Sequence, residues 1–179
     1  MTIRSSSLAA AMGVAGAILI ASRAVPLASP QNAHAEAAAW SPRAAAGYLD
    51  GRMDWWLKWP NAARDHDTTC VSCHTVLPYA LARPALHAPL AEHDLALPER
   101  AMLGHVVKRV RMWNEVEPFY PDQTRGLPKS SESRGTESVL NALVLATRDA
   151  SAGTLSEETE RAFANMWALQ FKAGELKGG

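Results

Sequence analysis

Residues 68–79, TTCVSCHTVLPY, contain the only two cysteines of this 179-residue chain, Cys70 and Cys73, and a histidine, His74, directly after them. Chance rarely places the only two cysteines three positions apart with a histidine beside them, so the C-x-x-C-H pattern is a strong signal. Four kinds of site can account for it: a disulfide, a zinc site, a redox-active dithiol and a covalently attached haem. The compartment and the elements around the pattern decide among them.

The first 35 residues differ in composition from the rest of the chain. One basic residue, Arg4, precedes an uncharged apolar run over residues 8–21, LAAAMGVAGAILIA. Such a run is typical of a signal-peptide core and is short for a bilayer span, which needs about 20 residues. Ala33 and Ala35 then offer an A-x-A cleavage pattern. We therefore expect residues 1–35 to be a signal peptide or, if they are not cleaved, an N-terminal anchor.

The charge balance argues against one class of partner. The whole chain has 18 basic and 18 acidic residues. The leader holds two of the basic residues and none of the acidic ones, so residues 36–179 are near neutral with a slight acidic excess. This balance gives no support to nucleic-acid binding, which needs a basic surface. We expect a periplasmic or otherwise exported protein that contacts a membrane only if the leader is retained.

Helix signals recur from Trp40 onward, and we find no convincing strand pattern. Ser41 followed by Pro42 is typical of a helix start, and Pro60 ends the predicted helix over residues 43–59. Prolines break the apolar stretch after the cysteines into short turns. A second helix is expected over residues 99–116.

The C-terminal part is expected to form two helices after a polar loop. The loop is predicted over residues 121–135, and the helices over residues 139–150 and 157–175, the second capped by Ser156. A short connection predicts an αα-hairpin. The fold expected is all-α, with short helices around the cysteine site and this hairpin at the C-terminus.

These expectations favour haem over a dithiol, a disulfide or a zinc site. A thioredoxin-like dithiol follows a strand, and no strand is expected before Thr69. A disulfide across two residues would close too short a loop to stabilise much. A zinc site needs a fourth ligand, which His66 could supply. For haem, a helical turn brings both thiols to one edge of the porphyrin and places the next histidine beneath the ring.

The sequence CVSCH at residues 70–74 resembles the attachment motif of c-type cytochromes. The resemblance implies one haem c, with thioether bonds to Cys70 and Cys73 and with His74 as the proximal iron ligand. A second resemblance is to exported bacterial proteins that place a haem motif at the start of helices similar to the α/α toroids of squalene–hopene cyclases. It implies that residues 36–179 are a helical haem domain that begins a longer array, without terpene chemistry, because no D-x-D-D motif is present. The stretches that carry it are WWLKWPNAARDHDTTCVSCHTVLPYALARPAL (55–86), VVKRVRMWNEVEPFY (106–120), SRGTESVLNALVLATRDA (133–150) and NMWALQFKAGELKG (165–178).

The sixth iron ligand decides what such a protein does. Met112 is the slightly favoured candidate, although a methionine at helical spacing is more often a packing residue. The other candidates are Met102, Met166, His66, His87, His93 and His105. Two strong ligands favour one-electron transfer with a redox partner protein, whereas an open side favours ligand binding. We expect an electron carrier rather than an enzyme; the alternatives are a haem-bearing helical scaffold or sensor, and a haem-dependent enzyme with an open iron site.

Two further groups of residues have ordinary and functional interpretations. The basic residues Lys108, Arg109 and Arg111 are expected on a solvated helix face, or else beside haem propionates or an acidic partner. The tryptophans Trp55, Trp56 and Trp59 are expected in the hydrophobic core, or at the edge of the haem.

Overall fold

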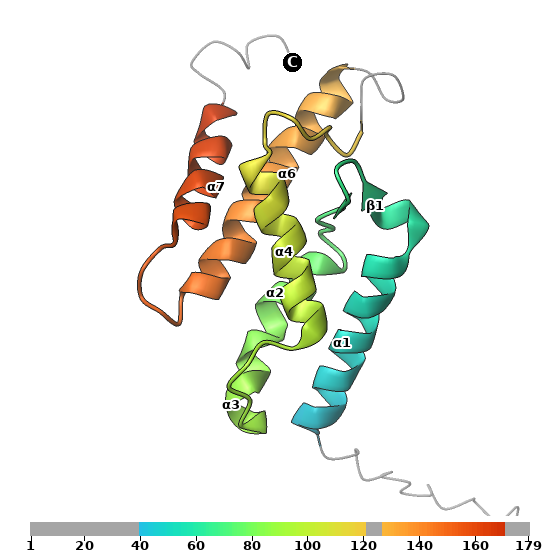
Figure 1. The fold of residues 1–179 in the computed structure, drawn as a ribbon, viewed down its shortest axis with the longest axis vertical. Coiled ribbons are helices and arrows are strands. Elements are labelled where there is room, and N and C mark those ends of the chain that lie inside the picture. The colour runs from blue at the N-terminus through green and yellow to red at the C-terminus, as the bar shows by residue number, and fades with distance from the viewer. Residues whose placement is uncertain (1–39, 121–126, 171–179) are drawn as a thin grey trace, which may run out of the picture. The chain divides into compact units, whose positions relative to one another are not determined.

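The computed structural model describes residues 40–120 and 127–170, which are mostly helical (Figure 1). The leader lies outside the described residues. The helices are α1 (Pro42–Lys58), α2 (Val76–Ala82), α3 (His87–Leu90), α4 (Leu97–Arg111), α6 (Leu127–Asp149) and α7 (Glu157–Ala168), with 3₁₀ turns at Pro60–Ala62 and Pro84–Leu86. The expected all-α class is therefore confirmed for this part of the chain.

One short hairpin departs from that class. Strands β1 (Ala63–Arg64) and β2 (Thr68–Thr69) pair antiparallel, with Ala63 opposite Thr69. The expectation that no strand precedes Thr69 is wrong, because strands of two residues are too short to show an alternating pattern. His66 and Asp67 at the tip have positive φ angles of 53° and 50°, and the Thr68 N–H closes the turn on the Asp65 carbonyl at 3.1 Å.

The start of α1 follows the local sequence. The Ala44 N–H donates to the Ser41 hydroxyl at 3.3 Å, and Pro42 occupies the first turn, where a missing N–H costs nothing. The helix ends at Lys58, because Trp59 takes an extended conformation ahead of Pro60. These bounds confirm the prediction to within one residue.

The two predicted boundaries on either side of the polar loop are wrong. Helix α4 ends at Arg111 instead of residue 116, and hydrogen-bonded turns follow it. The predicted loop over 121–135 is helical from Leu127, where α6 begins. The Arg134 guanidinium ties this part of α6 to the preceding segment by donating to the carbonyls of Trp113 and Val116. That tertiary contact favours helix where the polar sequence alone predicts a loop.

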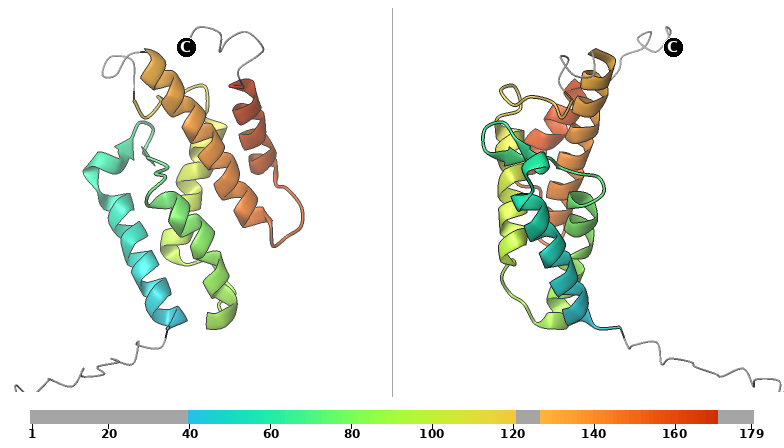
Figure 2. Two further views of the ribbon diagram at one scale, coloured as in Figure 1. Left: turned by 180° about the vertical axis from the view of Figure 1, so that it is seen from behind. Right: turned by 90° about the vertical axis from the view of Figure 1, so that its right-hand side faces the viewer.

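Helices α1, α2, α4 and α6 surround one hydrophobic core, and α7 packs against α4 and α6 (Figures 1 and 2). Ser156 caps α7 as expected, by accepting the Thr159 N–H at 3.3 Å. The helix ends at Ala168, so the predicted end at residue 175 is wrong. The fully buried core members include Met53, Val106 and Leu145. No described helix is both long and apolar enough to cross a bilayer.

Candidate functional site

The cysteine motif lies in an irregular segment between β2 and α2. Cys70, Val71 and Ser72 have no regular structure, a turn covers Cys73 to Thr75, and α2 begins only at Val76. The expectation that a helical turn presents both thiols is therefore wrong in detail. The two cysteines are instead separated by two residues of irregular backbone.

Both backbone polar groups of Cys70 are held by the protein. Its N–H donates to the Ala62 carbonyl at 2.8 Å, and its carbonyl accepts the Trp56 indole N–H at 3.0 Å. The next side chain, Val71, is buried in the core at 1% exposure. Cys70 is thus fixed against the end of α1, and its side chain is half-buried.

Ser72 organises the second half of the motif. Its hydroxyl accepts the N–H groups of His74 and Thr75 at 3.1 and 3.2 Å, and its carbonyl accepts the Leu77 N–H at 3.0 Å. Cys73 and His74 project from this turn and are exposed. Among the described residues, the His74 imidazole has no hydrogen-bond partner.

A cavity of about 430 Å³ opens beside the motif, and we name it the thiol pocket. Its volume is within the range of small-molecule and cofactor sites. The walls come from the end of α1, the hairpin, the motif, the segment after α4 and the first half of α6. The residues that line it are Trp56, Trp59, Asn61, Arg64, Cys70, Val71, Ser72, Cys73, His74, Phe119, Tyr120, Lys129, Glu132, Ser133, Thr136 and Leu140.

The three tryptophans run from this pocket to the surface. Trp56 and Trp59 line the pocket, and Trp55 stacks on Trp59 with ring centroids 5.2 Å apart. Trp55 is 44% exposed and carries the Arg52 guanidinium 4.5 Å above its ring. The expectation of a core cluster is therefore wrong for Trp55, whereas Trp56 packs partly against the core.

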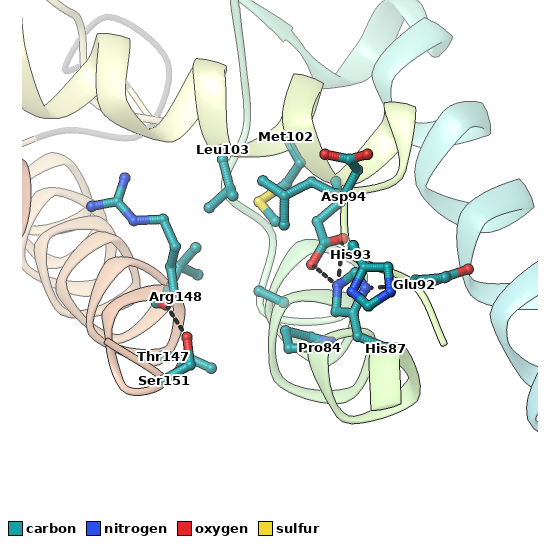
Figure 3. A pocket seen from close by; sticks show the side chains of 14 residues that line it. Pro84, His87, Glu92, His93, Asp94, Met102, Leu103, Thr147, Arg148 and Ser151 are labelled. Atoms are coloured by element: carbon teal, nitrogen blue, oxygen red, sulfur yellow. Dashed lines mark hydrogen bonds and ion pairs between the residues drawn. The ribbon is translucent and has the colours of Figure 1, made fainter. Parts of the chain in front are cut away.

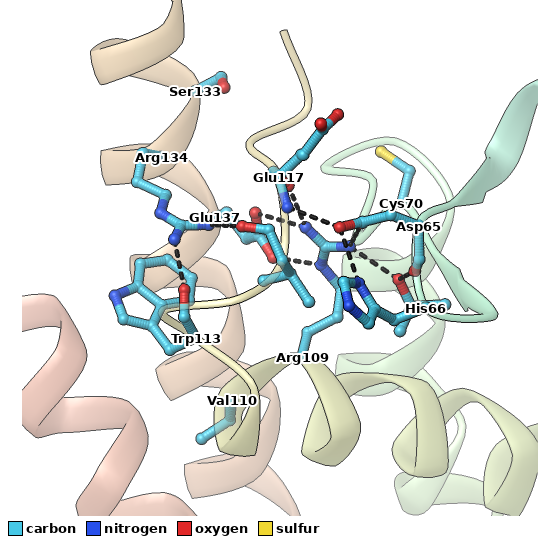
Figure 4. A network of polar contacts seen from close by, with 12 residues as sticks. Asp65, His66, Cys70, Arg109, Val110, Trp113, Glu117, Ser133, Arg134 and Glu137 are labelled. Carbon is cyan, nitrogen blue, oxygen red and sulfur yellow. Dashed lines mark hydrogen bonds and ion pairs between the residues drawn. The ribbon is translucent and has the colours of Figure 1, made fainter. Parts of the chain in front are cut away.

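Arg109 joins the hairpin to the helices (Figure 4). Its guanidinium is completely buried and binds the buried Glu137 carboxylate, the Thr68 hydroxyl at 2.7 Å, the Asp65 carboxylate at 3.3 Å and the Glu117 carbonyl at 2.7 Å. The expectation that Arg109 lies on a solvated face is wrong. Its donors are all directed at the protein, so they are not available to a ligand.

The surroundings of Cys70 and Asp65 shift the pKa values of these two groups in opposite directions. Burial raises the pKa of the Cys70 thiol, which keeps it protonated at neutral pH. Burial also acts to raise the pKa of Asp65, but hydrogen bonds from the Glu117 N–H and His66, together with the Arg109 charge, hold that pKa below its usual value. Asp65 thus remains a carboxylate and supports the hairpin.

The two cysteines are free thiols, not a disulfide. Among the described residues, no group of three or more histidine, cysteine, aspartate or glutamate side chains is placed to hold a metal ion. A zinc site would need such a group from Cys70, Cys73, His74 and His66. His66 instead lies at the hairpin tip, with its ring 3.0 Å from the Asp65 carboxylate.

None of the candidate distal ligands lines the thiol pocket, whose lining includes no described methionine and no described histidine other than His74. Met112 is half-buried at the C-terminal end of α4, Met102 is buried in the core, and Met166 packs partly against it from α7. Burial lowers the pKa of His105. The assignment of Met112 stays a prediction.

A second cavity of about 290 Å³, which we name the acidic pocket, lies among α2, α3, α4 and α6 (Figure 3). His87 lies between two carboxylates there, 3.1 Å from Glu92 and 3.0 Å from Glu99. The neighbouring Arg83 is buried and binds Asp50 and Glu92 at 2.9 and 2.7 Å. His93 also lines this pocket, so two of the histidines considered as iron ligands are here.

Sequence reasoning missed three residues that shape the thiol pocket: Arg64, Ser72 and Phe119. Ser72 had a readable signal, because a serine inside a turn can accept nearby backbone N–H groups. The positions of Arg64 and Phe119 depend on segments that are far apart along the chain. No family model, curated protein or solved structure matches this chain.

Proposed function

We propose that this chain is an exported c-type haem protein that transfers one electron at a time through a single haem bound to Cys70 and Cys73, with His74 as the proximal ligand. The observation that carries the proposal is the placement of these three side chains. Two free thiols lie at an aromatic-walled cavity together with an imidazole that has no hydrogen-bond partner among the described residues. No other cluster of described residues offers this donor set.

The residues present fit a haem group. Thiols form the covalent bonds, and a neutral imidazole nitrogen is a normal iron ligand. The pocket supplies apolar walls in Trp56, Trp59 and Phe119. When bound, haem supplies the reversible exchange of one electron at its iron.

The chain's own residues hold and shield this position. The two backbone hydrogen bonds of Cys70 and the Ser72 turn fix where the donors project. Trp56 and Trp59 would cover one side of a bound haem with apolar surface, and such shielding tunes an iron potential. Trp55 extends the aromatic wall to the surface, where a redox partner protein can approach.

Co-expression with a cytochrome c maturation system tests the proposal. We expect the purified chain to stay red through acid–acetone extraction and denaturing electrophoresis. A Cys70→Ala/Cys73→Ala variant should lose the colour, and Ser131→Ala, an exposed change on α6, is the matched control. Colourless wild-type protein that binds stoichiometric zinc would contradict the proposal.

A second candidate is a haem protein with an open iron side, either a helical scaffold or sensor or a haem-dependent enzyme. The absence of methionine and of a second histidine from the described lining of the thiol pocket favours it. Rapid carbon monoxide binding by the reduced holoprotein, unchanged in Met112→Ala, would favour the open site. Slow binding that Met112→Ala accelerates would favour methionine ligation and the electron carrier.

The remaining parts of the proposal concern the chain's organisation. Residues 1–35 act as a signal peptide or anchor, and N-terminal sequencing of exported protein should begin near Glu36. An intact N-terminus in the membrane fraction would favour the anchor. Helices α6 and α7 form the αα-hairpin, an arrangement supported by their direct packing, and a longer α/α array would continue from them.

A further inference from the structure

Arg64 at the end of β1 differs from the other cations near the cysteine motif. It lines the thiol pocket together with Cys70 and His74. One terminal nitrogen donates to the carbonyls of Asn61 and Ala63 at 2.9 and 2.7 Å. Its Nε is buried and has no hydrogen-bond partner among the described residues. No carboxylate among the described residues forms an ion pair with it.

An unpaired, buried guanidinium donor is costly in a protein interior. The two buried arginines of the described fold, Arg83 and Arg109, avoid that cost, because each binds two carboxylates. Arg64 is half-buried, and its buried Nε has no such partner. The Arg64 guanidinium instead lies 5.7 Å from the centre of the Phe119 ring, and its Nε has no acceptor among the described residues. The thiol pocket is therefore lined by a guanidinium that no described carboxylate pairs with.

The second cation of the pocket does not share this feature. Lys129 on α6 has a side chain that is 41% exposed, and it already pairs with Glu132 at 2.9 Å. Exposed pairs of this kind contribute little and exchange partners readily. Arg64 is therefore the stronger anion anchor.

We infer that Arg64 binds a carboxylate of the ligand held in the thiol pocket. This inference rests on the proposed function, in which the ligand is haem and the carboxylate is one of its propionates. The planar guanidinium presents donors at a spacing that matches a carboxylate. This assignment replaces the basic residues of α4 as partners of the propionates, because Arg109 is fully engaged elsewhere and Arg111 pairs with Glu158.

A binding experiment separates the carboxylate from the rest of the haem. The reduced full chain, without attached haem, is titrated with ferric haem and with its dimethyl ester, which lacks the propionate charges. The measured quantity is the ratio of the two dissociation constants. We expect wild type to prefer the acid form by about tenfold, as a charge-assisted pair implies. Arg64→Gln should abolish the preference, and Arg64→Lys should retain part of it.

Two matched variants test whether the effect belongs to Arg64. Arg52→Gln removes an exposed guanidinium that does not line the pocket, and it should leave the ratio unchanged. Lys129→Gln should lower the ratio less than Arg64→Gln does. Circular dichroism confirms folding, and if Arg64→Gln does not fold, a lowered ratio in Arg64→Lys supports the inference and an unchanged one overturns it.

The possible failures are distinguishable. If wild type acquires covalent haem in the maturation system but the ratio in Arg64→Gln equals that of wild type, the Arg64 assignment is wrong and the proposed function stands. An equal drop in Arg52→Gln would also overturn the assignment, because it would indicate a general charge effect. If wild type neither attaches nor binds haem, the proposed function and this inference both fall.

Discussion

The thiol pocket and the acidic pocket both contain charged side chains, but these side chains differ in whether they have protein partners. At the acidic pocket, Arg83 binds two carboxylates, and His87 lies between Glu92 and Glu99. At the thiol pocket, the Arg64 Nε is buried without a partner, and the imidazole of His74 has none among the described residues.

This difference distinguishes polar groups that stabilise the fold from polar groups that can contact a ligand. Buried polar groups that are fully paired hold elements together, because each donor has already found its acceptor. Groups left unpaired beside a cavity are available to a ligand. By this criterion the paired groups at the acidic pocket join α1, α2, α3 and α4, whereas the thiol pocket is the proposed binding site.

The largest effect should come from breaking the support of the hairpin beside the thiol pocket. Arg109→Leu leaves the buried Glu137 carboxylate without its cation, so we expect the free energy of unfolding to fall by about 3–5 kcal/mol. The matched control is Arg111→Leu, since Arg111 is exposed and its pair with Glu158 is worth little. Urea unfolding followed by circular dichroism measures both. Equal losses in the two variants would contradict a structural role specific to Arg109.

The next largest effect should come from the contact that fixes Cys70. Trp56→Phe keeps an aromatic side chain but removes the indole N–H that donates to the Cys70 carbonyl at 3.0 Å. We expect a loss of about 1–2 kcal/mol in the free energy of unfolding, because that carbonyl loses its donor. Haem incorporation should also fall, measured as haem absorbance per protein. Trp55→Phe is the control, and it should affect both quantities less, since Trp55 makes no such bond.

The acidic pocket should give the fold part of its acid sensitivity. Hydrogen bonds from Arg83, opposed by desolvation, hold the pKa of Glu92 below its usual value of 4.5. A depressed pKa stabilises the fold above the unfolded-state value, and this contribution is lost as pH falls through the folded-state value. Glu92 is about one-third exposed, so we expect Glu92→Gln to cost about 1 kcal/mol at pH 7 and less at pH 3. Unfolding curves at both pH values measure it, and an equal cost at both would refute the assignment.

The smallest effect should come from the turn inside the motif. Ser72→Ala removes the hydroxyl that accepts the N–H groups of His74 and Thr75, and water can replace it at this partly exposed position. We expect a cost of about 0.5 kcal/mol in stability. The spectrum of the ferric protein should show a larger share of misligated iron than wild type. Ser72→Thr keeps the hydroxyl and should behave like wild type; if it behaves like Ser72→Ala, the hydroxyl is not what matters.

The parts of the fold that the sequence predicted are those encoded locally. Ser41, Pro42 and Pro60 lie next to the boundaries that they set, so the bounds of α1 were readable. The helical structure of the first half of α6 could not be predicted from its local sequence, KSSESRGTES at residues 129–138. Its helix is held by Arg134 and Glu137, whose partners come from the segment before it and from α4.

The same division applies to the candidate site. The donor set is one pentapeptide, so the sequence predicted it, and the structure brings its three side chains to one cavity. The cavity itself is built from α1, the hairpin, the segment after α4 and α6. The basic side chain that lacks a carboxylate partner at this cavity can therefore be identified only from the folded structure. The sequence directed attention to Arg109, which is fully paired, and gave no reason to choose Arg64.

The most direct test of the account is the intact mass of the purified chain after co-expression with a cytochrome c maturation system, combined with alkylation of free thiols. The account predicts a mass increase of one haem and no alkylation at Cys70 or Cys73, because both sulfurs are in thioether bonds. The Cys70→Ala/Cys73→Ala variant should show no haem mass. A wild-type mass without haem, in which both cysteines become alkylated, would contradict the central claim.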